Sequence, residues 1–275
     1  MKSILVATDF SAPSRAAAQY AAALCKLNGA TLTLLHAYLL PTPVSEVPYV
    51  MVSVEELQKD NEKLVGELAV ALQQQFGIEV KTLVSIGLPA DEVVFQAGET
   101  GADLIVAGMR GVTNTLDKLI GSTTSAILRK STIPVLVIPE QIVYSGWQQI
   151  AYATDFNHTM NLRCLNMLKV LAGNHPALQL NVVHVQRPGE IMSAEQIAGK
   201  VRLDPMLEAI PHKYVELEHE SVEEGLKRFL QDVACDVLVM VAHKHSWWER
   251  LFSGSHTRDM VYQSEIPLLV LQDQE

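Results

Sequence analysis

The chain repeats itself on the scale of a whole domain, and this repeat limits the folds open to it more than any other feature. Residues 4–10 read ILVATDF, and residues 150–156 read IAYATDF. The last third of each half matches at one constant offset, which pairs Asp103 with Asp236, Gly121-Ser122 with Gly254-Ser255, and Ile133-Pro134 with Ile266-Pro267. Solenoid repeats are about 20–50 residues long. The longer period here predicts a duplicated domain.

The length of the chain agrees with this interpretation. It has 275 residues, whereas single domains typically have about 100–200. We place domain one at residues 1–140 and domain two at residues 149–275. Residues 140–147, which include Ser145-Gly146, form the predicted linker. Because this linker is short, we expect the two domains to pack together.

Apolar runs alternate with stretches of helical spacing along the first half. The predicted strands are residues 4–8, 31–36, 79–85, 103–107 and 134–138, and the predicted helices are residues 12–27, 54–76, 89–100 and 114–130. Ser11 is a suitable N-cap for the first helix, and Gly77 a suitable end for the second. This alternation indicates an α/β fold. We predict two tandem Rossmann-like domains, each a five-stranded parallel sheet with helices on both faces.

The composition argues against several classes of function. The formal net charge is −10, so the basic surface typical of nucleic-acid-binding proteins is not expected. No run of about 18 apolar residues is present, and the first residues read as a strand rather than a signal peptide. We therefore expect a cytoplasmic protein with no nucleic-acid or membrane partner. Cys25, Cys164 and Cys235 are isolated in sequence and are expected to be buried thiols.

A glycine pattern follows the fourth predicted strand. Gly108 and Gly111 are followed, nine residues later, by Gly121-Ser122 and then Thr123-Thr124. Glycine past the end of a strand permits positive φ and close approach of backbone N–H groups to an anion, and hydroxyls add donors for a phosphate. The spacing differs from the Walker and dinucleotide motifs. The alternative is that the first two glycines only turn the chain, with Gly121 packed inside a helix.

With its other signals, the pattern Gly-x2-Gly-x9-Gly-Ser resembles the ATP-binding motif of the universal stress protein family. The shared signals are Asp9 in ATDF, His36 in LLHA, Gly87-x-Pro89, and the closing run IPVLVI. The resemblance spans essentially the whole chain twice, as in tandem members of that family. It implies ATP binding in domain one, with Mg²⁺, in a protein that acts as a nucleotide-dependent regulatory module in stress response.

The resemblance also assigns roles to individual residues. Asp9 matches an acceptor for ribose hydroxyls, although an Asx-type turn before the helix is its plain alternative. Ala37 matches a position whose backbone meets adenine. The phosphate positions are Gly108, Gly111, Gly121, Ser122 and Thr123. His36 is expected to be a core histidine with a satisfied ring and no chemical role.

Domain two departs from this pattern. Gly108 corresponds to Val241 and Gly111 to Lys244, while Asp155 and Gly254-Ser255 remain. Because a β-branched residue rarely adopts positive φ, we expect domain two not to bind ATP as domain one does. The positive charge of Lys244 leaves open the binding of a smaller anion in domain two. Restoring glycine at both altered positions is expected to restore binding if only they block the site.

No catalytic constellation and no metal site is predicted. There is no G-x-S-x-G elbow, and the isolated pair His243 and His245, with His256 further on, is expected to be a surface feature rather than a metal site. Two rivals to the regulatory module stay open. One is a slow ATPase or phosphotransfer enzyme that uses the same loop, and the other is a scaffold with a different small ligand in domain two.

The fifth strand of each half, residues 134–138 and 267–271, is apolar and expected at a sheet edge. Bare apolar edges invite pairing, and members of the universal stress protein family, which this chain resembles, pair subunits through this strand. We therefore expect an internal pseudo-dimer of the two halves, with a homodimer of the whole chain as a further possibility.

Overall fold

The computed structural model describes residues 1–40, 53–109, 121–157, 160–172, 177–242 and 266–272. The first half contains β1 (Ser3–Ala7), α1 (Ala12–Asn28), β2 (Thr31–Tyr38), α2 (Val54–Phe76), β3 (Val80–Ile86), α3 (Pro89–Glu99), β4 (Leu104–Met109), α4 (Ser122–Lys130) and β5 (Val135–Pro139). The second half contains β6 (Gln149–Ala153), α5 (Leu162–Ala172), β7 (Gln179–Gln186), α6 (Ala194–Leu207), β8 (His212–Glu218), α7 (Val222–Asp232), β9 (Val237–Ala242) and β10 (Leu268–Gln272).

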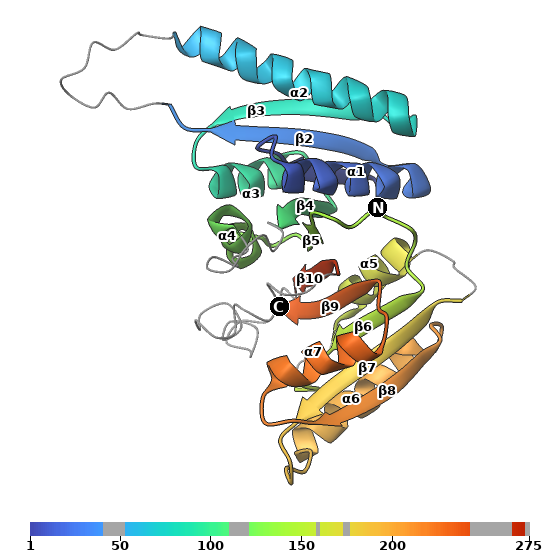
Figure 1. The fold of residues 1–275 in the computed structure, drawn as a ribbon. Helices are drawn as coiled ribbons and strands as arrows, with labels where there is room; N and C mark the ends of the chain where they lie inside the picture. The colour runs from blue at the N-terminus through green and yellow to red at the C-terminus, as the bar shows by residue number, and fades with distance from the viewer. Residues whose placement is uncertain (41–52, 110–120, 158–159, 173–176, 243–265, 273–275) are drawn as a thin grey trace, which may run out of the picture.

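The described strands form one sheet of ten, in the order β3-β2-β1-β4-β5-β10-β9-β6-β7-β8. Figure 1 shows them following one another from β3 at one end of the molecule to β8 at the other. All pairs within a half are parallel, whereas β5 and β10 are antiparallel, with Leu268 opposite Val137 and Val270 opposite Val135. The two predicted five-stranded parallel sheets are therefore present, joined edge to edge at their fifth strands.

Helices cover both faces of this sheet, as predicted. Buried residues of α1, α2, α5 and α6 share one core cluster, and those of α3, α4 and α7 share the cluster on the opposite face. Each cluster contains residues from both halves of the chain. The antiparallel seam therefore lies beneath continuous apolar packing on both sides.

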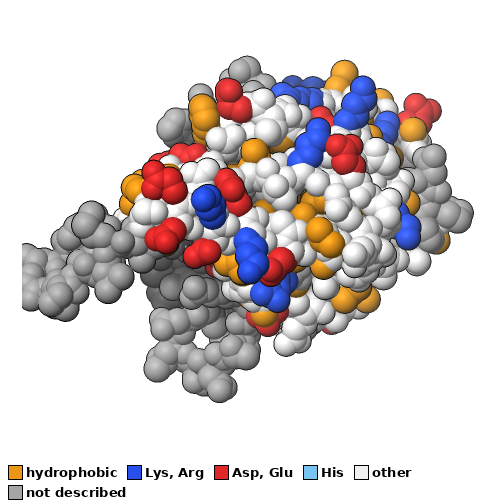
Figure 2. All heavy atoms as spheres, turned by 90° about the horizontal axis from the view of Figure 1, so that it is seen from above, with side chains coloured by type: hydrophobic (Ala, Val, Ile, Leu, Met, Phe, Trp, Pro, Cys, Tyr) orange, Lys and Arg blue, Asp and Glu red, His pale blue; other side chains and the backbone are white. Residues whose placement is uncertain are grey.

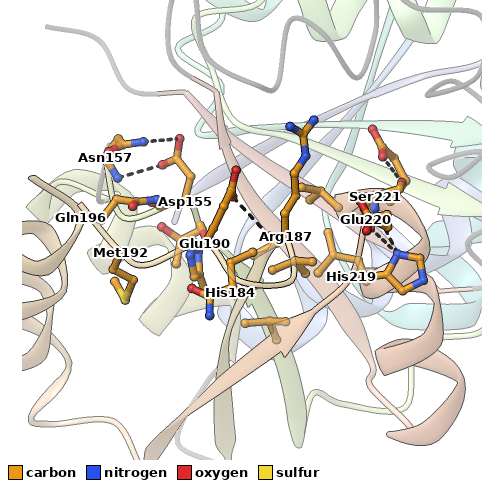
Figure 3. A pocket seen from close by; sticks show the side chains of 18 of the residues that line it. Asp155, Asn157, His184, Arg187, Glu190, Met192, Gln196, His219, Glu220 and Ser221 are labelled. Carbon is orange, nitrogen blue, oxygen red and sulfur yellow. Dashed lines mark hydrogen bonds between the residues drawn. The ribbon is translucent and has the colours of Figure 1, made fainter.

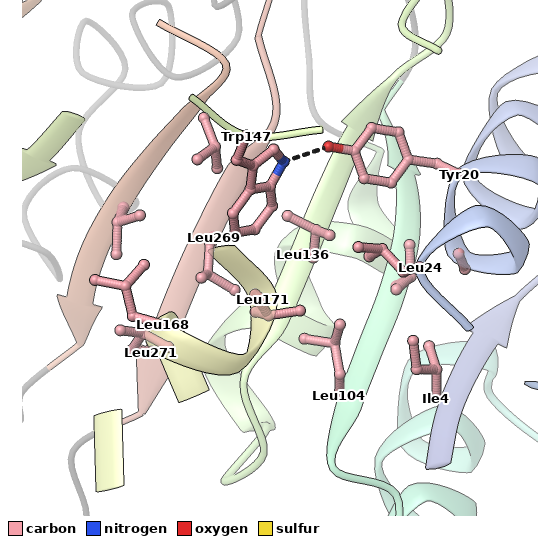
Figure 4. Close-up of a cluster of buried hydrophobic side chains, with 14 of the residues drawn as sticks. Ile4, Tyr20, Leu24, Leu104, Leu136, Trp147, Leu168, Leu171, Leu269 and Leu271 are labelled. Carbon is pink, nitrogen blue, oxygen red and sulfur yellow. Dashed lines mark hydrogen bonds between the residues drawn. The ribbon is translucent and has the colours of Figure 1, made fainter. Parts of the chain in front are cut away.

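The segment between β5 and β6 is anchored to this core by Trp147. Trp147 is only 1% exposed, and its indole N–H donates to the hydroxyl of Tyr20 in α1 over 2.7 Å (Figure 4). The ring of Tyr144 meets Tyr20 edge-on, with centroids 5.1 Å apart. The predicted linker is thus held against the first half, and Leu136 of β5 and Leu269 of β10 belong to the same core cluster.

Local capping explains where several of the helices begin and where two of them end. Ser11, Ser53, Ser193 and Ser221 cap α1, α2, α6 and α7 through their side chains. Gly29 and Gly77 end α1 and α2 with φ of 62° and 66°, where a left-handed residue favours glycine. The predicted helix 54–76 is confirmed at both ends, whereas the predicted helix 114–130 begins only at Ser122 within the described residues.

The repeat extends to the start of the first strand in each half. The carboxylate of Asp103 accepts from the backbone N–H groups of Lys2 and Ser3, at 2.5 and 3.2 Å. The carboxylate of Asp236 accepts from those of Gln148 and Gln149, at 2.6 and 2.8 Å. These matched aspartates anchor the strands, and this is a structural role.

The surface carries charges of both signs. On the face seen in Figure 2, Lys and Arg side chains are interspersed with Asp and Glu. None of the described helices combines the length and apolar character needed to cross a bilayer.

Candidate nucleotide site

The first strand ends in a strained turn that presents Asp9. Phe10 has φ of 62°, one of two non-glycine residues with positive φ in the described chain, a conformation that costs about 1–2 kcal/mol for an L-residue. Its N–H donates to the Thr8 hydroxyl at 3.1 Å, and its carbonyl accepts from Arg15 at 3.0 Å. Its ring packs 4.7 Å from that of His36. These contacts hold the turn and place Asp9 directly before α1.

Local hydrogen bonds orient the carboxylate of Asp9. The backbone N–H of Ser11 donates to Oδ1 at 3.1 Å, and the Ser11 hydroxyl donates to the same oxygen. Burial alone would raise the pKa of Asp9, but these hydrogen bonds outweigh it, so the pKa lies below the ordinary value. The Asx-type turn considered for Asp9 is therefore present, and it fixes an ionised carboxylate beside α1.

The second strand contributes His36 and Ala37. The Nδ1–H of His36 donates to the carbonyl of Thr8 at 2.8 Å, so the predicted hydrogen bond of the ring is present, but His36 is half-buried rather than part of the core. Ala37 lies opposite Ser85 near the end of β2 and lines a cavity together with Leu35. The first and second strands are thus tied together where both end.

Gly108 lies within β4, opposite Ile138 of β5. The expectation of positive φ at this glycine is wrong, because Gly108 is not among the positive-φ residues. Glycine is required there for a steric reason: a Cβ would lie 2.5 Å from the carbonyl oxygen of Pro13 in the first turn of α1. The Gly108 carbonyl also accepts from the Thr124 hydroxyl at 3.0 Å. Gly108 thus brings the starts of α1 and α4 close to β4.

Gly121 is the N-cap of α4 rather than a residue inside a helix, so that alternative is wrong. It makes no side-chain cap, and Ser122, Thr123 and Thr124 form the first turn. The first backbone N–H groups of a helix have no partner within the helix. A Cβ at Gly121 would meet no atom of the described residues within 4 Å. The start of α4 therefore offers donors to an open space.

That space is a cavity of about 330 Å³ at the carboxyl ends of β1, β2 and β4. Six of the seven predicted site residues line it: Asp9, Ala37, Gly108, Gly121, Ser122 and Thr123. The seventh, Gly111, lies outside the described residues. Residues that were not predicted for the site also line the cavity, Thr8, Ser11, Pro13, Ser14, Val93 and Ile127 among them, and so does Thr124, which follows the predicted Thr123. Pro89, at the start of α3, was visible in sequence only as part of Gly87-x-Pro89.

The second half repeats the turn after its first strand. Phe156 has φ of 60°, and its N–H donates to the Thr154 hydroxyl at 3.0 Å. The Nδ1–H of His184 donates to the Thr154 carbonyl at 2.9 Å, and the Phe156 and His184 rings lie 5.0 Å apart. Asp155 thus occupies the same position in the turn as Asp9.

The fourth strand of the second half differs. Val241 lies in β9, is 5% exposed, and belongs to the same apolar cluster as Met160 and Cys164. The expected conflict with positive φ does not arise, because Val241 has no positive φ. Instead, the helix after the first strand starts later. Helix α1 begins at Ala12, which corresponds to position 158 when Asp9 is matched with Asp155, and α5 begins four residues further on, at Leu162. The valine side chain therefore lies beside a helix that starts later.

The other candidates have structural roles or lie outside the described residues. Cys25, Cys164 and Cys235 are buried free thiols, and burial raises the pKa of Cys25 to about 12. The described residues contain no group of three His, Cys, Asp or Glu suited to a metal. The undescribed candidates are Arg110, His243, Lys244, His245, Trp247, Trp248, Phe252, Gly254, Ser255, His256 and Thr257.

Comparison with known proteins places this geometry in a family. The model of the Universal stress protein family matches residues 1–139 and again 146–272. A universal stress protein of Synechocystis sp. is 30% identical over 222 residues, covering 79% of this chain and 74% of its own length. One from Methanocaldococcus jannaschii is 30% identical over 152 residues, covering 50% of this chain and 94% of its own.

Among solved structures, a universal stress protein from Archaeoglobus fulgidus has the same fold over both halves. It aligns with a TM-score of 0.76 and 19% identity, covering 98% of each chain. Together with the two matches of the family model, this shows that the chain belongs to the universal stress protein family as a tandem member.

Proposed function

We propose that the first half binds ATP in the cavity at the ends of β1, β2 and β4. The observation that carries this proposal is the convergence of six motif residues on one cavity beside the uncapped start of α4. Small-molecule pockets commonly enclose about 300–1,000 Å³. The cavity has about 330 Å³ within its described lining.

The chemistry of the lining suits the two ends of a nucleotide. At one end, the ionised carboxylate of Asp9 lines the cavity and suits a ligand hydroxyl. At the other end, the N–H groups of Ser122, Thr123 and Thr124 and the hydroxyls of Ser122 and Thr123 suit a phosphate, since helix N-termini favour anions. The start of α3 also lacks a side-chain cap, and Pro89 lines the same cavity.

Mg²⁺ is proposed to arrive with the nucleotide rather than on a protein site. The lining described here has a single carboxylate, Asp9, and Mg²⁺ commonly keeps several waters and binds phosphate oxygens. When bound, the ion would neutralise phosphate charge in a protein of net charge −10.

We further propose that ATP acts as a regulatory ligand in a cytoplasmic protein whose paired halves form an internal pseudo-dimer. The β5–β10 pairing supports this arrangement. The rival function is slow hydrolysis of ATP. Phosphate release from the purified protein, followed over hours, distinguishes it from the regulatory role. Release that Gly111→Val abolishes would identify an ATPase instead.

Calorimetric titration of the full chain with Mg·ATP tests the site. Gly111→Val is expected to weaken binding by about 1–3 kcal/mol, because a side chain displaces backbone donors from the phosphate. Circular dichroism provides the control for folding. Unchanged affinity in a folded variant would show that this loop does not hold the phosphates.

A further inference from the structure

The second half has a cavity of its own, and it is larger than the first. It has about 540 Å³ and lies at the carboxyl ends of β6 and β7, between the loop before α6 and the start of α7 (Figure 3). Val183, Val185 and Leu226 provide apolar walls. Its described lining does not include Val241 of β9, the counterpart of Gly108 in β4.

The charges around this cavity are predominantly negative. Asp155, Glu190, Glu220 and Glu223 line it, with Arg187 as the one Lys or Arg among the described lining residues. The described lining of the first cavity has only Asp9. Residues 243–265, which follow β9 in sequence, contain three Lys or Arg and three Asp or Glu, so they add no formal charge. A cleft lined mainly by carboxylates attracts cations and repels phosphates.

His184 adds a buried acceptor to this lining. It is 3% exposed and lines the cavity. Its Nδ1–H donates to the Thr154 carbonyl, so in the neutral ring Nε2 carries the lone pair. The corresponding His36 is not among the residues that line the first cavity. The second cavity therefore has a histidine in its lining that the described lining of the first cavity lacks.

Several neutral donors around the cavity are already engaged. The backbone N–H of Asn157 donates to Asp155 Oδ1 at 3.0 Å, and Gln196 Nε2 donates to the Asp155 carbonyl at 3.1 Å. The Ser221 hydroxyl donates to Glu223. The start of α7 is capped by Ser221, whereas its counterpart α3 is uncapped. Among the described lining residues, Arg187 is the charged donor, against four carboxylates. Acceptors therefore outnumber free donors, and a matching ligand brings N–H or O–H groups.

We propose that this cavity binds a small organic cation, an amine with several N–H donors and a hydrocarbon chain. The ammonium groups pair with the carboxylates at the rim and reach Nε2 of His184, while the carbon chain packs on Val183, Val185 and Leu226. A bare metal ion is disfavoured, because the described residues contain no group of three suitable ligands. The site is independent of the ATP site proposed for the first half.

Calorimetric titration of the full chain with spermidine at about 0.15 M salt tests this proposal, because exposed charges more than about 8 Å apart are largely screened there. One saturable site per chain is expected. Glu190→Gln with Glu220→Gln is expected to weaken it about tenfold, because two charge-assisted hydrogen bonds become neutral ones. The control Glu67→Gln with Glu208→Gln removes the same charge from two exposed positions outside the cavity and should retain the affinity.

Nitrogen NMR of the histidines gives a second readout. Binding of spermidine is expected to shift the Nε2 resonance of His184 at the same concentration that saturates the heat signal. No saturable binding, equal weakening by the control pair, or an unmoved His184 resonance would each overturn the proposal. A separate ATP titration of the same variants keeps the two sites distinguishable, since ATP affinity should not change in the Glu190→Gln/Glu220→Gln protein.

Discussion

The two halves of the molecule end their first strand alike and their fourth strand differently. In both, a left-handed phenylalanine follows an aspartate, and a histidine donates to the carbonyl of the preceding threonine. In the first half, a glycine lets two helix starts approach the sheet. In the second, Val241 fills the core instead. The strained turn can thus be retained while the chemistry beside it changes.

The second turn is held by a different helix. The Phe10 carbonyl accepts from Arg15 of α1, whereas in the second half α6 lies against the turn. A Cβ on Gly199 would stand 1.8 Å from the Phe156 carbonyl oxygen, and Lys200 lies 5.9 Å from the Phe156 ring centroid. The short connection between β7 and α6 therefore brings α6 against the turn at Phe156, and α6 forms one wall of the second cavity.

The largest effect is expected from Gly199→Ala. A methyl group cannot coexist with the Phe156 carbonyl at 1.8 Å, so α6 must move away, and a loss of about 3 kcal/mol in unfolding free energy is expected. Urea denaturation measures it. The matched control is Gly66→Ala in α2, where a Cβ meets nothing within 4 Å and alanine should add about 0.5–1 kcal/mol. Effects of the same sign in both variants would contradict the contrast between α2 and α6.

Gly108→Ala should affect stability and ATP binding together. The added Cβ lies 2.5 Å from the Pro13 carbonyl, so α1 shifts from β4 at a cost of about 2 kcal/mol, and Ser11 and Ser14 move with it. Urea denaturation and calorimetry measure the two losses. Gly121→Ala is the control for stability, since it meets open space and should change the unfolding free energy by well under 1 kcal/mol. A Gly108→Ala protein with both properties intact would refute the steric role.

The number of nucleotides bound per chain tests whether the two halves are equivalent. Native mass spectrometry at saturating ATP is expected to show one nucleotide per chain. We expect the count to stay at one in Val241→Gly with Lys244→Gly, because the later start of α5 and the capped α7 remain. Two nucleotides on the wild-type chain would show that the halves are equivalent. Two on the variant alone would show that these positions are the whole barrier.

The smallest effect concerns the protonation of Asp9. The pKa of the Asp9 carboxyl is lower in the folded protein than in the unfolded chain. The carboxylate therefore contributes fully to stability at a pH above its pKa in the unfolded chain, and this contribution is lost as the pH falls through its pKa in the folded protein. Asp9→Asn should therefore be slightly less stable than wild type near pH 7, with the difference vanishing at lower pH. Denaturation curves across that range measure it. A difference that persists below the folded pKa would point to a cause other than charge.

Much of this fold could be predicted from sequence, because its signals are local. The repeat, the ends of α2 and the N-cap at Ser11 depend on neighbouring residues. The reasons for particular glycines could not be predicted. Gly108 and Gly199 meet backbone atoms of other segments, and motif spacing contains no information on such distances. The acid-lined cavity was missed for the same reason, since its carboxylates come from separate loops.

The antiparallel pairing of β5 with β10 has a thermodynamic consequence for the duplicated chain. Since continuous cores cross this seam on both faces, the two halves share one unfolding equilibrium and should melt in a single transition. A ligand present at 100 times its dissociation constant stabilises the state that it binds by about 2.7 kcal/mol. Occupancy of either half would thus suppress opening of the whole chain. Such coupling between ligand binding in the two halves needs no conformational change, because both halves belong to one unfolding equilibrium.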